Sequence, residues 1–441
     1  MATKQLRMEQ CSKSEINYDA LPREQIVIVG DYTAYHGPTS ALNDNTPLQF
    51  DIKGSGADYL DPSDMYLKLK IKLTKSDGGA ITTTHSVAPI NDIGNAMFSN
   101  LDLVMNNAVV SHTSNMHHYK CYMSSLTNLS EDVKKTQLYM EGWHPDVAGD
   151  FDKVTNQGFI DRKARFSKDN EVELKIKLQT DLGFQNRLIP NEVDLRITLT
   201  RAKNSFCLQS FDTVDDQHPQ EQYKISVTHA ELQVRKVKLE PSCQMALEKS
   251  IFSGSGAHFP VNHMVMKSYN IPTNSSTHSI DGLFNGQRPV MCMMGLVTNT
   301  AHNGDYATTP WNFDHHHLNF LELNVDGQPV PSHPLQPDYL GNRYIDSFET
   351  IYRGNLMLGS DMTHGIKYTD YKDGNCLYAF NLTADKSDGS SHFVGKNFGN
   401  VRLALRFSKP TTQTLTLIVL GQFSNIITIH GNRQVVFDYA R

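Results

Sequence analysis

Closely spaced cysteines are missing from this sequence, and tryptophan is scarce. The 441 residues include two tryptophans and six cysteines, namely Cys11, Cys121, Cys207, Cys243, Cys292 and Cys376. No two of these cysteines have the CxxC spacing. A zinc ribbon or a thioredoxin-like site needs such a pair of thiols, so both are excluded.

An excess of positive charge is missing as well. The chain has 41 Lys and Arg against 47 Asp and Glu, which gives a formal net charge of -6 at pH 7. Proteins that wrap nucleic acid need surplus basic residues to neutralise phosphates. The charge balance therefore argues against a protein that binds nucleic acid through its own surface, and we expect no sequence-specific nucleic-acid binding.

Long apolar runs are absent too. The most apolar run, Leu415–Leu420, is far shorter than the ~20 residues that a membrane-spanning helix needs. The first residues, MATKQLRMEQCSKSE, lack the apolar core of a secretion signal. We therefore expect synthesis in a cytosol, where thiols stay reduced.

Common catalytic and phosphate-binding motifs do not occur. The sequence has no GxSxG, no GxxxxGK[ST] and no HExxH. Gly-Ser-Gly occurs at 54–56 and 254–256, but no helix follows that could hold a phosphate, so both are interpreted as loops. We expect a protein that is not an enzyme, with no catalytic residues, no cofactor and no metal.

Alternation of apolar and polar residues dominates what is present. Leu67, Leu69, Ile71 and Leu73 alternate with lysines, which is typical of a strand with one buried face and one wet face. The same pattern returns in both halves of the chain, at 172–178, 193–199, 225–227, 232–234, 401–407 and 415–419. Residues that favour turns separate these runs. The sequence predicts an all-β protein.

Helices and a domain boundary are predicted at few places. Ser130–Tyr139 and Ser242–Lys249 each begin with a serine that can cap a helix. Phe211–Gln222 is polar, acidic and without apolar period, which favours a linker. We therefore expect two domains, at 1–212 and 213–441.

Two similar β-sandwiches explain this division best. The strands at 191–206 and 399–414 both follow a turn and lead into a basic polar segment. A jelly-roll needs about eight strands in two sheets, with long loops between them. We predict two tandem eight-stranded jelly-rolls with a few short helices. The irregular segments Glu141–Gly158 and Thr298–Asn312 are expected to be exposed loops.

The most prominent cluster of possible metal ligands is His315, His316 and His317, beside Asp314. Adjacent residues of a strand point to opposite faces, so at most His315 and His317 share a side. Two imidazoles without a third ligand favour a polar loop or the start of a strand over a metal site. A second hypothesis is that histidine protonation weakens a contact between subunits.

A second cluster comprises the carboxylates Asp58, Asp61 and Asp64. They could form a calcium site or a glycosidase pair. Because Pro62 lies between them and Asp and Ser favour turns, we interpret the segment as a turn.

Seven segments, in order along both halves, carry a resemblance to a known family. They are CSKSEINYD (11–19), PLQFDIKGSGADYLDPSDMYLKLKIK (47–72), FSNLDLVMNNAVVS (98–111), IPNEVDLRITLTRAKNSFCL (189–208), DGLFNGQRP (281–289), LELNVDGQPVPSHPLQPDY (321–339) and FSNIITIHGNRQVVFDY (423–439). Together these segments resemble the major capsid proteins of Maverick/Polinton elements and of adintovirus-like viruses.

The resemblance implies a double jelly-roll that trimerises into a pseudo-hexagonal capsomer of an icosahedral virion around double-stranded DNA. It implies contacts with neighbouring capsomers, penton proteins and minor capsid proteins. It also implies that the N-terminal arm, with Lys4, Arg7 and Lys13, lies toward the inside of the shell. Contact with an internal membrane stays open.

Two alternatives share the strand pattern. A capsid gene domesticated by a host genome would keep the fold without forming virions. A jelly-roll that binds or hydrolyses carbohydrate would need clustered aromatic residues, and Trp143 and Trp311 are the whole supply of tryptophan.

Overall fold

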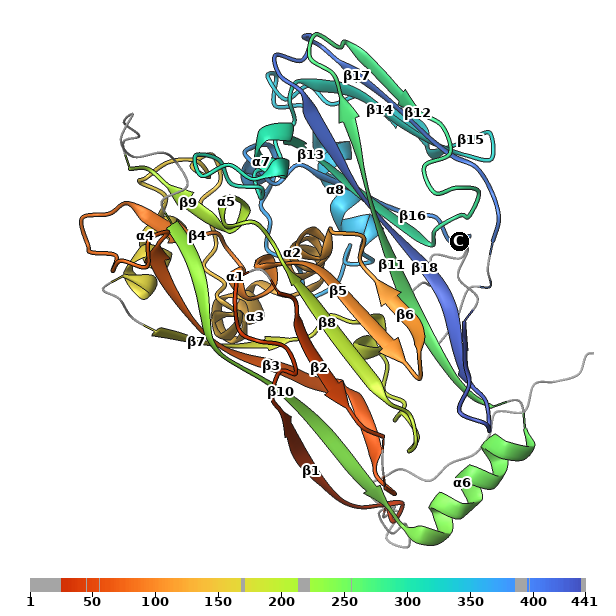
Figure 1. Ribbon diagram of the computed structural model, residues 1–441. Coiled ribbons are helices and arrows are strands. Elements are labelled where there is room, and N and C mark those ends of the chain that lie inside the picture. The colour runs from red at the N-terminus through yellow and green to blue at the C-terminus, as the bar shows by residue number, and fades with distance from the viewer. Residues whose placement is uncertain are drawn as a thin grey trace, which may run out of the picture.

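The computed structural model describes residues 25–44, 46–54, 56–167, 171–212, 223–254, 256–384, 395 and 397–437. Within them the chain forms two β-sandwiches that lie side by side, with most of the helices beside them (Figure 1). The predicted all-β class is confirmed. The N-terminal arm and most of the expected linker at 211–222 lie outside the described residues.

The first sandwich is built from two four-stranded antiparallel sheets. One sheet has the order β1-β10-β3-β7 and the other β2-β8-β5-β6. A short pair, β4 (Val87–Pro89) and β9 (Leu208–Ser210), lies beside them. The eight main strands are β1 (Ile28–His36), β2 (Leu48–Ile52), β3 (Tyr59–Lys75), β5 (Phe98–Met105), β6 (Ala108–His112), β7 (Glu171–Lys177), β8 (Leu195–Arg201) and β10 (Tyr223–Leu239).

The second sandwich repeats this plan. Its sheets have the orders β11-β18-β13-β16 and β12-β17-β14-β15, and β19 (Val435–Phe437) pairs with β18. The main strands are β11 (Ala257–Ile271), β12 (Thr277–Ile280), β13 (Met291–Thr298), β14 (Leu318–Val325), β15 (Gln328–Leu335), β16 (Leu377–Asn381), β17 (Val401–Phe407) and β18 (Leu415–Ile429).

The two sandwiches have identical strand order. When the eight main strands of each half are numbered along the chain, both halves have the orders 1-8-3-6 and 2-7-4-5. This is the path of a jelly-roll, in which two Greek keys close two four-stranded sheets. The predicted pair of eight-stranded jelly-rolls is therefore confirmed.

The division between the halves lies later than expected. Strand β10 follows the expected boundary at 212/213, yet it pairs with β1 and β3 of the first jelly-roll. Strand pairing thus places the division at α6 (Pro241–Ser253), the helix that joins β10 to β11. The polar composition of residues 211–222 therefore does not mark the division between the halves.

The predicted helices are present, with one correction. Ser130 caps α3 (Glu131–Thr136) by accepting a hydrogen bond from the Val133 amide, and the helix continues as η2 (Gln137–Glu141). For α6 the cap is Glu240 and not Ser242, because the Glu240 carboxylate accepts the amides of Ser242 and Cys243. The other helices are α1 (Ile93–Ala96), α2 (His117–Asn128), α4 (Gln157–Phe166), η3 (Asp181–Phe184), α5 (Asn204–Cys207), α7 (Asn299–Asn303), α8 (Ile345–Gly354) and α9 (Tyr368–Lys372). No helix of the described ranges is long and apolar enough to cross a membrane.

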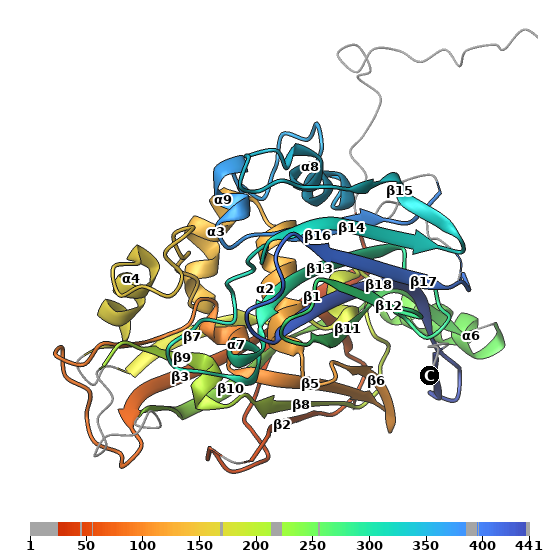
Figure 2. The ribbon, with the colours of Figure 1, turned by 90° about the horizontal axis from the view of Figure 1, so that it is seen from above.

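Each jelly-roll carries a helical insertion between its fifth and sixth main strands. In the first half α2 lies in this insertion, between β6 and β7, and in the second half α8 lies between β15 and β16. Figure 2 shows α2 between the two jelly-rolls and α8 at the outer edge of the second. Every residue of α2 from His117 to Thr127 is buried, whereas α8 buries one side only.

Close packing of α8 on its own jelly-roll depends on Gly354. A Cβ at this position would lie 2.4 Å from the backbone of Ala379 in β16. We expect Gly354→Ala to lower the free energy of unfolding by about 1–3 kcal/mol, because the helix must move away from the strand. Urea denaturation measures this. The control is Gly37→Ala, where a Cβ would meet nothing within 4 Å, and equal effects of the two changes would contradict the explanation.

Candidate functional site

The histidine cluster lies in a turn directly before β14. His316 and His317 have positive φ angles of 44° and 59°, so the segment is not a strand. His315 stacks on Tyr339 with ring centroids 4.3 Å apart, and its ring also contacts that of His317. Burial lowers the pKa of His315 and of His316, so both side chains are neutral at pH 7. The polar interpretation of this segment fits the structure.

The histidines line a polar cavity of about 620 Å³ together with Asp152, threonines of the β13–β14 connection and residues 410–413. Asp314 lies 3.8 Å from His315 Nε2 and 3.5 Å from His316 Nδ1. Throughout the described part of the chain, no three His, Cys, Asp or Glu side chains are placed to hold a metal ion.

The three clustered carboxylates do not converge on one point. Asp58 accepts a hydrogen bond of 2.7 Å from the Tyr32 hydroxyl of β1. Asp61 is buried, accepts the amide and the hydroxyl of Ser63, and forms an ion pair of 2.9 Å with Arg235. The interpretation as a turn is wrong from Asp61 onward, because Asp61 and Asp64 lie in β3, at a register shift against β10. The contacts of Asp58 and Asp61 tie the start of β3 to the neighbouring strands β1 and β10.

An aromatic stack joins the two jelly-rolls. Trp311, from the connection between β13 and β14, is fully buried and stacks on Tyr122 of α2 at 4.1 Å between centroids. Trp143 stacks on the same tyrosine, at 5.4 Å. The indole N–H of Trp311 donates to the Asn91 carbonyl at 2.9 Å. The expectation that 141–158 and 298–312 are exposed loops is therefore wrong for their tryptophans, which are core residues.

A buried ion cluster joins the same two halves. Asp181 of η3 accepts hydrogen bonds from Lys120 Nζ of α2 at 2.8 Å and from His263 Nδ1 of β11 at 2.7 Å. The side chains of Lys120 and Asp181 are each 1% exposed. Burial alone would raise the pKa of Asp181. The charge of Lys120 and the hydrogen bond from His263 outweigh this effect and bring the pKa well below its ordinary value. Sequence reasoning missed all three residues, which lie far apart along the chain.

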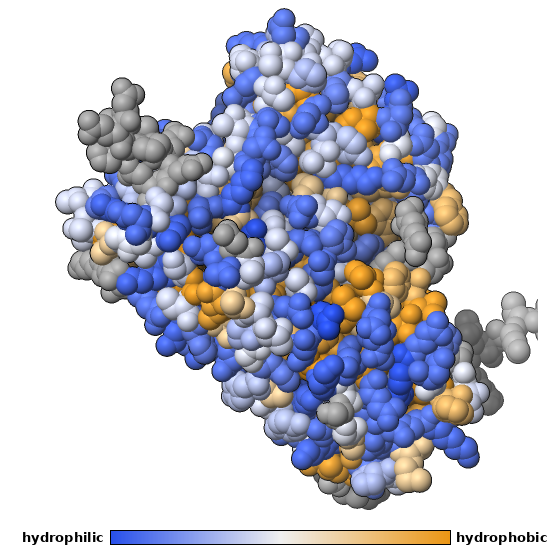
Figure 3. Space-filling model, in the orientation of Figure 1, coloured by the Kyte–Doolittle hydropathy of each residue, from blue (hydrophilic) through white to orange (hydrophobic). Residues whose placement is uncertain are grey.

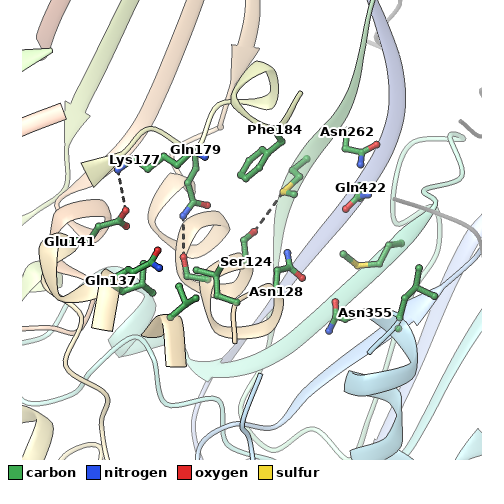
Figure 4. Close-up of a pocket in the computed structure, with 18 of the residues that line it drawn as sticks. Ser124, Asn128, Gln137, Glu141, Lys177, Gln179, Phe184, Asn262, Asn355 and Gln422 are labelled. Atoms are coloured by element: carbon green, nitrogen blue, oxygen red, sulfur yellow. Dashed lines mark hydrogen bonds between the residues drawn. The ribbon is translucent and has the colours of Figure 1, made fainter. Parts of the chain in front are cut away.

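Next to these contacts lies a cavity of about 630 Å³ between the jelly-rolls. Figure 4 shows Ser124, Asn128 and Gln179 of the first half on one side, and Asn262, Gln422 and Asn355 of the second half on the other. Ser124 Oγ lies 3.7 Å from Met264 Sδ. Most lining groups are neutral amides and apolar side chains, which suits packing between domains better than acid–base chemistry.

Glu141, in the lining of this cavity, is one of two carboxyl groups that are buried close together. Glu141 Oε1 accepts the Lys177 amide at 3.1 Å, and Asn95 Nδ2 donates to both Glu141 Oε2 and Asp92 Oδ1. Burial raises the pKa of Glu141, and burial together with the charge of Glu141 raises the pKa of Asp92. The side chain of Asn95 occupies the position between the two carboxyl groups, so a substrate cannot lie there to exchange a proton with them.

The surface seen in Figure 3 is mostly hydrophilic, with hydrophobic residues gathered in the middle, where β6 meets β11 and β18. Further large apolar side chains are exposed in β1, α6 and the insertion around α8.

Comparisons with known proteins agree with the fold. No protein-family model matches the sequence. An uncharacterized protein of Caenorhabditis elegans is 22% identical over 414 residues, which cover 90% of this chain and 95% of the nematode protein.

Solved structures of viral capsids share the architecture. A chain of the Sputnik virophage matches with a TM-score of 0.64 at 12% identity, covering 98% of this chain and 93% of that one. The PBCV-1 capsid matches with a TM-score of 0.59 at 11% identity, over 96% and 100% of the chains. The mavirus major capsid protein matches with a TM-score of 0.54 at 11% identity, over 99% and 97%. The chain therefore has the double jelly-roll fold of these viral proteins over nearly its whole length.

The buried ion cluster predicts a large effect of Asp181→Asn. The change leaves the Lys120 ammonium buried without its carboxylate, so we expect the free energy of unfolding to fall by about 3–5 kcal/mol. Chemical denaturation measures this. Asp150→Asn, which removes the exposed ion pair with Lys153, is the control and should cost about 0–1 kcal/mol. Similar losses in both variants would contradict a special role of the buried cluster.

Buried histidines predict sensitivity to acid. Burial lowers the pKa of His117 to about 3 and those of His144 and His364 to about 4. Since these folded-state values lie below the unfolded value of about 6.5, the unfolded state binds more protons, and stability is lost as pH falls from about 6.5 toward 4. We expect the melting temperature to fall over this window.

His364 offers a variant for this test. Its Nδ1 accepts the Ile366 amide at 3.2 Å, and Gln at this position could replace that acceptor without titrating. His364→Gln should therefore reduce the loss of melting temperature between pH 6.5 and pH 4. An unchanged pH profile in the variant would show that His364 does not contribute.

Proposed function

We propose that this protein is the major capsid protein of a double-stranded DNA virus or virus-like element of the Maverick/Polinton type. The observation that carries the proposal is the end-to-end match to a virophage chain, over 98% of one protein and 93% of the other. A match confined to one jelly-roll would indicate only a common sandwich, whereas this match spans both jelly-rolls and their order along the chain.

The duplicated fold suits a trimeric capsomer. Three chains with two similar jelly-rolls each would present six similar walls, which tile a near-hexagonal lattice while the ring closes by threefold symmetry. Such trimers would pack against each other, and against penton and minor capsid proteins, in an icosahedral shell. The protein would act in the virion after synthesis in a host cytosol.

No enzymatic step belongs to this proposal. The carboxylates and histidines that could have carried one are engaged in contacts with neighbouring strands, in stacking or in the contacts between the halves. Both tryptophans are buried, so neither supplies an exposed platform for a sugar ring. This leaves the carbohydrate-binding alternative without its main recognition element.

A second candidate is favoured by the nematode relative. That protein comes from an animal and aligns over 95% of its length. A capsid gene resident in an animal genome, either in a mobile element or domesticated, would explain this relationship. Such a protein would keep the fold and the contacts between subunits even if no virion is formed.

Native mass is the decisive test of the proposed trimer. We expect the purified protein to elute near 149 kDa in light scattering, which is three times the 49.6 kDa chain. Negative-stain images of the same peak should show a hexagonal outline. A monomer of about 50 kDa at every concentration tested would contradict a self-assembling capsomer.

A further inference from the structure

We infer that the insertion around α8 of one copy packs on the outer face of the β1-β10-β3-β7 sheet of the next copy. This inference rests on the proposed function, and it assigns the two surfaces that meet between chains. It follows from a contact that already exists inside the chain, between α2 and the second jelly-roll.

The contact inside the chain covers part of the outer face of the β11-β18-β13-β16 sheet. Helix α2 contacts β11, and Ser124 of α2 reaches Met264 of that strand. Helix α8 packs on β13 and β16, at the other side of the same sheet. Strand β18 is buried on both faces from Leu415 to Asn425, although only one face points into its own sandwich. The insertion of the first jelly-roll thus covers the β11 side of the sheet of the second.

The counterpart of this sheet is uncovered. The β1-β10-β3-β7 sheet has the same strand order, and β10 is its counterpart of β18. Buried residues alternate with half-buried ones along much of β10 and β3, so one face lies in the core and the other faces outward. At the edge of this sheet Tyr32 and Tyr35 of β1 are 42% and 64% exposed.

The counterpart of α2 is uncovered as well. Helix α8 buries Ser347, Thr350, Ile351 and Gly354 against its own jelly-roll, and its opposite side is open. The segment 336–376 around it exposes large apolar side chains, which cost free energy in water unless a partner covers them. They are Leu340, Ile345, Leu358 and Met362, with exposed fractions from 56% to 71%.

The two open surfaces also carry opposite charge. Cross-strand pairing places Lys68, Lys70 and Lys72 on the same outward face as six further residues, namely Lys175, Lys177, Lys224, Glu171, Glu173 and Glu231. This face therefore holds six lysines against three glutamates. The segment 336–376 holds six acidic residues against four basic ones. Complementary charge favours this pairing over a contact of either surface with itself.

Repeating the internal relation leads from one chain to the next. One rotation relates the first jelly-roll to the second within a chain. We infer that the same rotation, which is one step around the ring, relates the second jelly-roll to the first jelly-roll of the neighbouring chain. Because the two surfaces differ, the contact is heterologous and must close as a ring or continue as a filament. Six steps through three chains match the proposed capsomer.

Two variants test the assignment, each disabling one surface. Ile345→Arg with Leu358→Arg places positive charge on the insertion, opposite the lysines, and removes apolar contacts. Lys70→Glu with Lys72→Glu places negative charge on the sheet, opposite the acidic insertion. Each variant alone should lose the trimer and elute as a monomer near 50 kDa, with a melting curve that shows a folded chain.

Mixing the two variants gives the sharper result. The Lys70→Glu/Lys72→Glu variant keeps an intact insertion, and the Ile345→Arg/Leu358→Arg variant keeps an intact sheet. One contact can therefore form between a molecule of each kind. A mixture should therefore give a 1:1 complex near 99 kDa, twice the 49.6 kDa chain, and no trimer. Met245→Arg on α6, where the side chain is 72% exposed, is the control and should leave the trimer unchanged.

The outcomes separate this inference from the proposed function. A wild-type protein that is monomeric overturns both. A wild-type trimer that persists in either double variant overturns the assigned surfaces and leaves the proposed trimer intact. Loss of the trimer in both double variants without a 1:1 complex in the mixture also overturns the assignment, because the two surfaces would then not meet.

Discussion

Burial of both faces of β18 is the constraint on which the rest of the molecule depends. A strand in a lone sandwich has one face toward water, and β10 in the first jelly-roll is of this kind. Strand β18 is different, because its outer face is apolar and amide-rich and is buried as well. The second jelly-roll therefore buries part of this sheet against the first, and the aromatic stack and the Asp181 cluster fix how the two meet.

Much of the fold could be predicted from the sequence, because a strand with one face in water shows an alternation of apolar and polar residues. The alternation around Leu67–Leu73 corresponds to β3, and that at 401–407 to β17. Helix α2 gave no such pattern. It is buried all round, so its sequence HHYKCYMSSLTN has no polar side to set a period. The same burial that makes α2 central to the molecule removed its amphipathic pattern.

The contacts between the halves could not be predicted for a related reason. Lys120, Asp181 and His263 lie on three separate elements, and only the fold brings them together. The tryptophans were visible in the sequence, but their surroundings suggested exposed loops. In contrast, the polar segment at His315 is a turn, as interpreted, because local geometry decides it. The predicted turn at Asp61 is instead part of β3, because pairing with the distant strand β10 decides it. Contacts within one short segment could be predicted from the sequence, whereas contacts between the two jelly-rolls could not.

The continuous chain through α6 has a consequence for assembly kinetics. Helix α6 buries none of its residues, so it acts as a tether and adds little packing of its own. A tether of this length keeps the two jelly-rolls at an effective concentration in the millimolar range, whatever the dilution of the protein. In a six-walled ring, every second contact would then be formed before any two molecules meet. Nucleation would require the encounter of three bodies instead of six, and each encounter avoided spares the loss of translational and rotational freedom of one subunit.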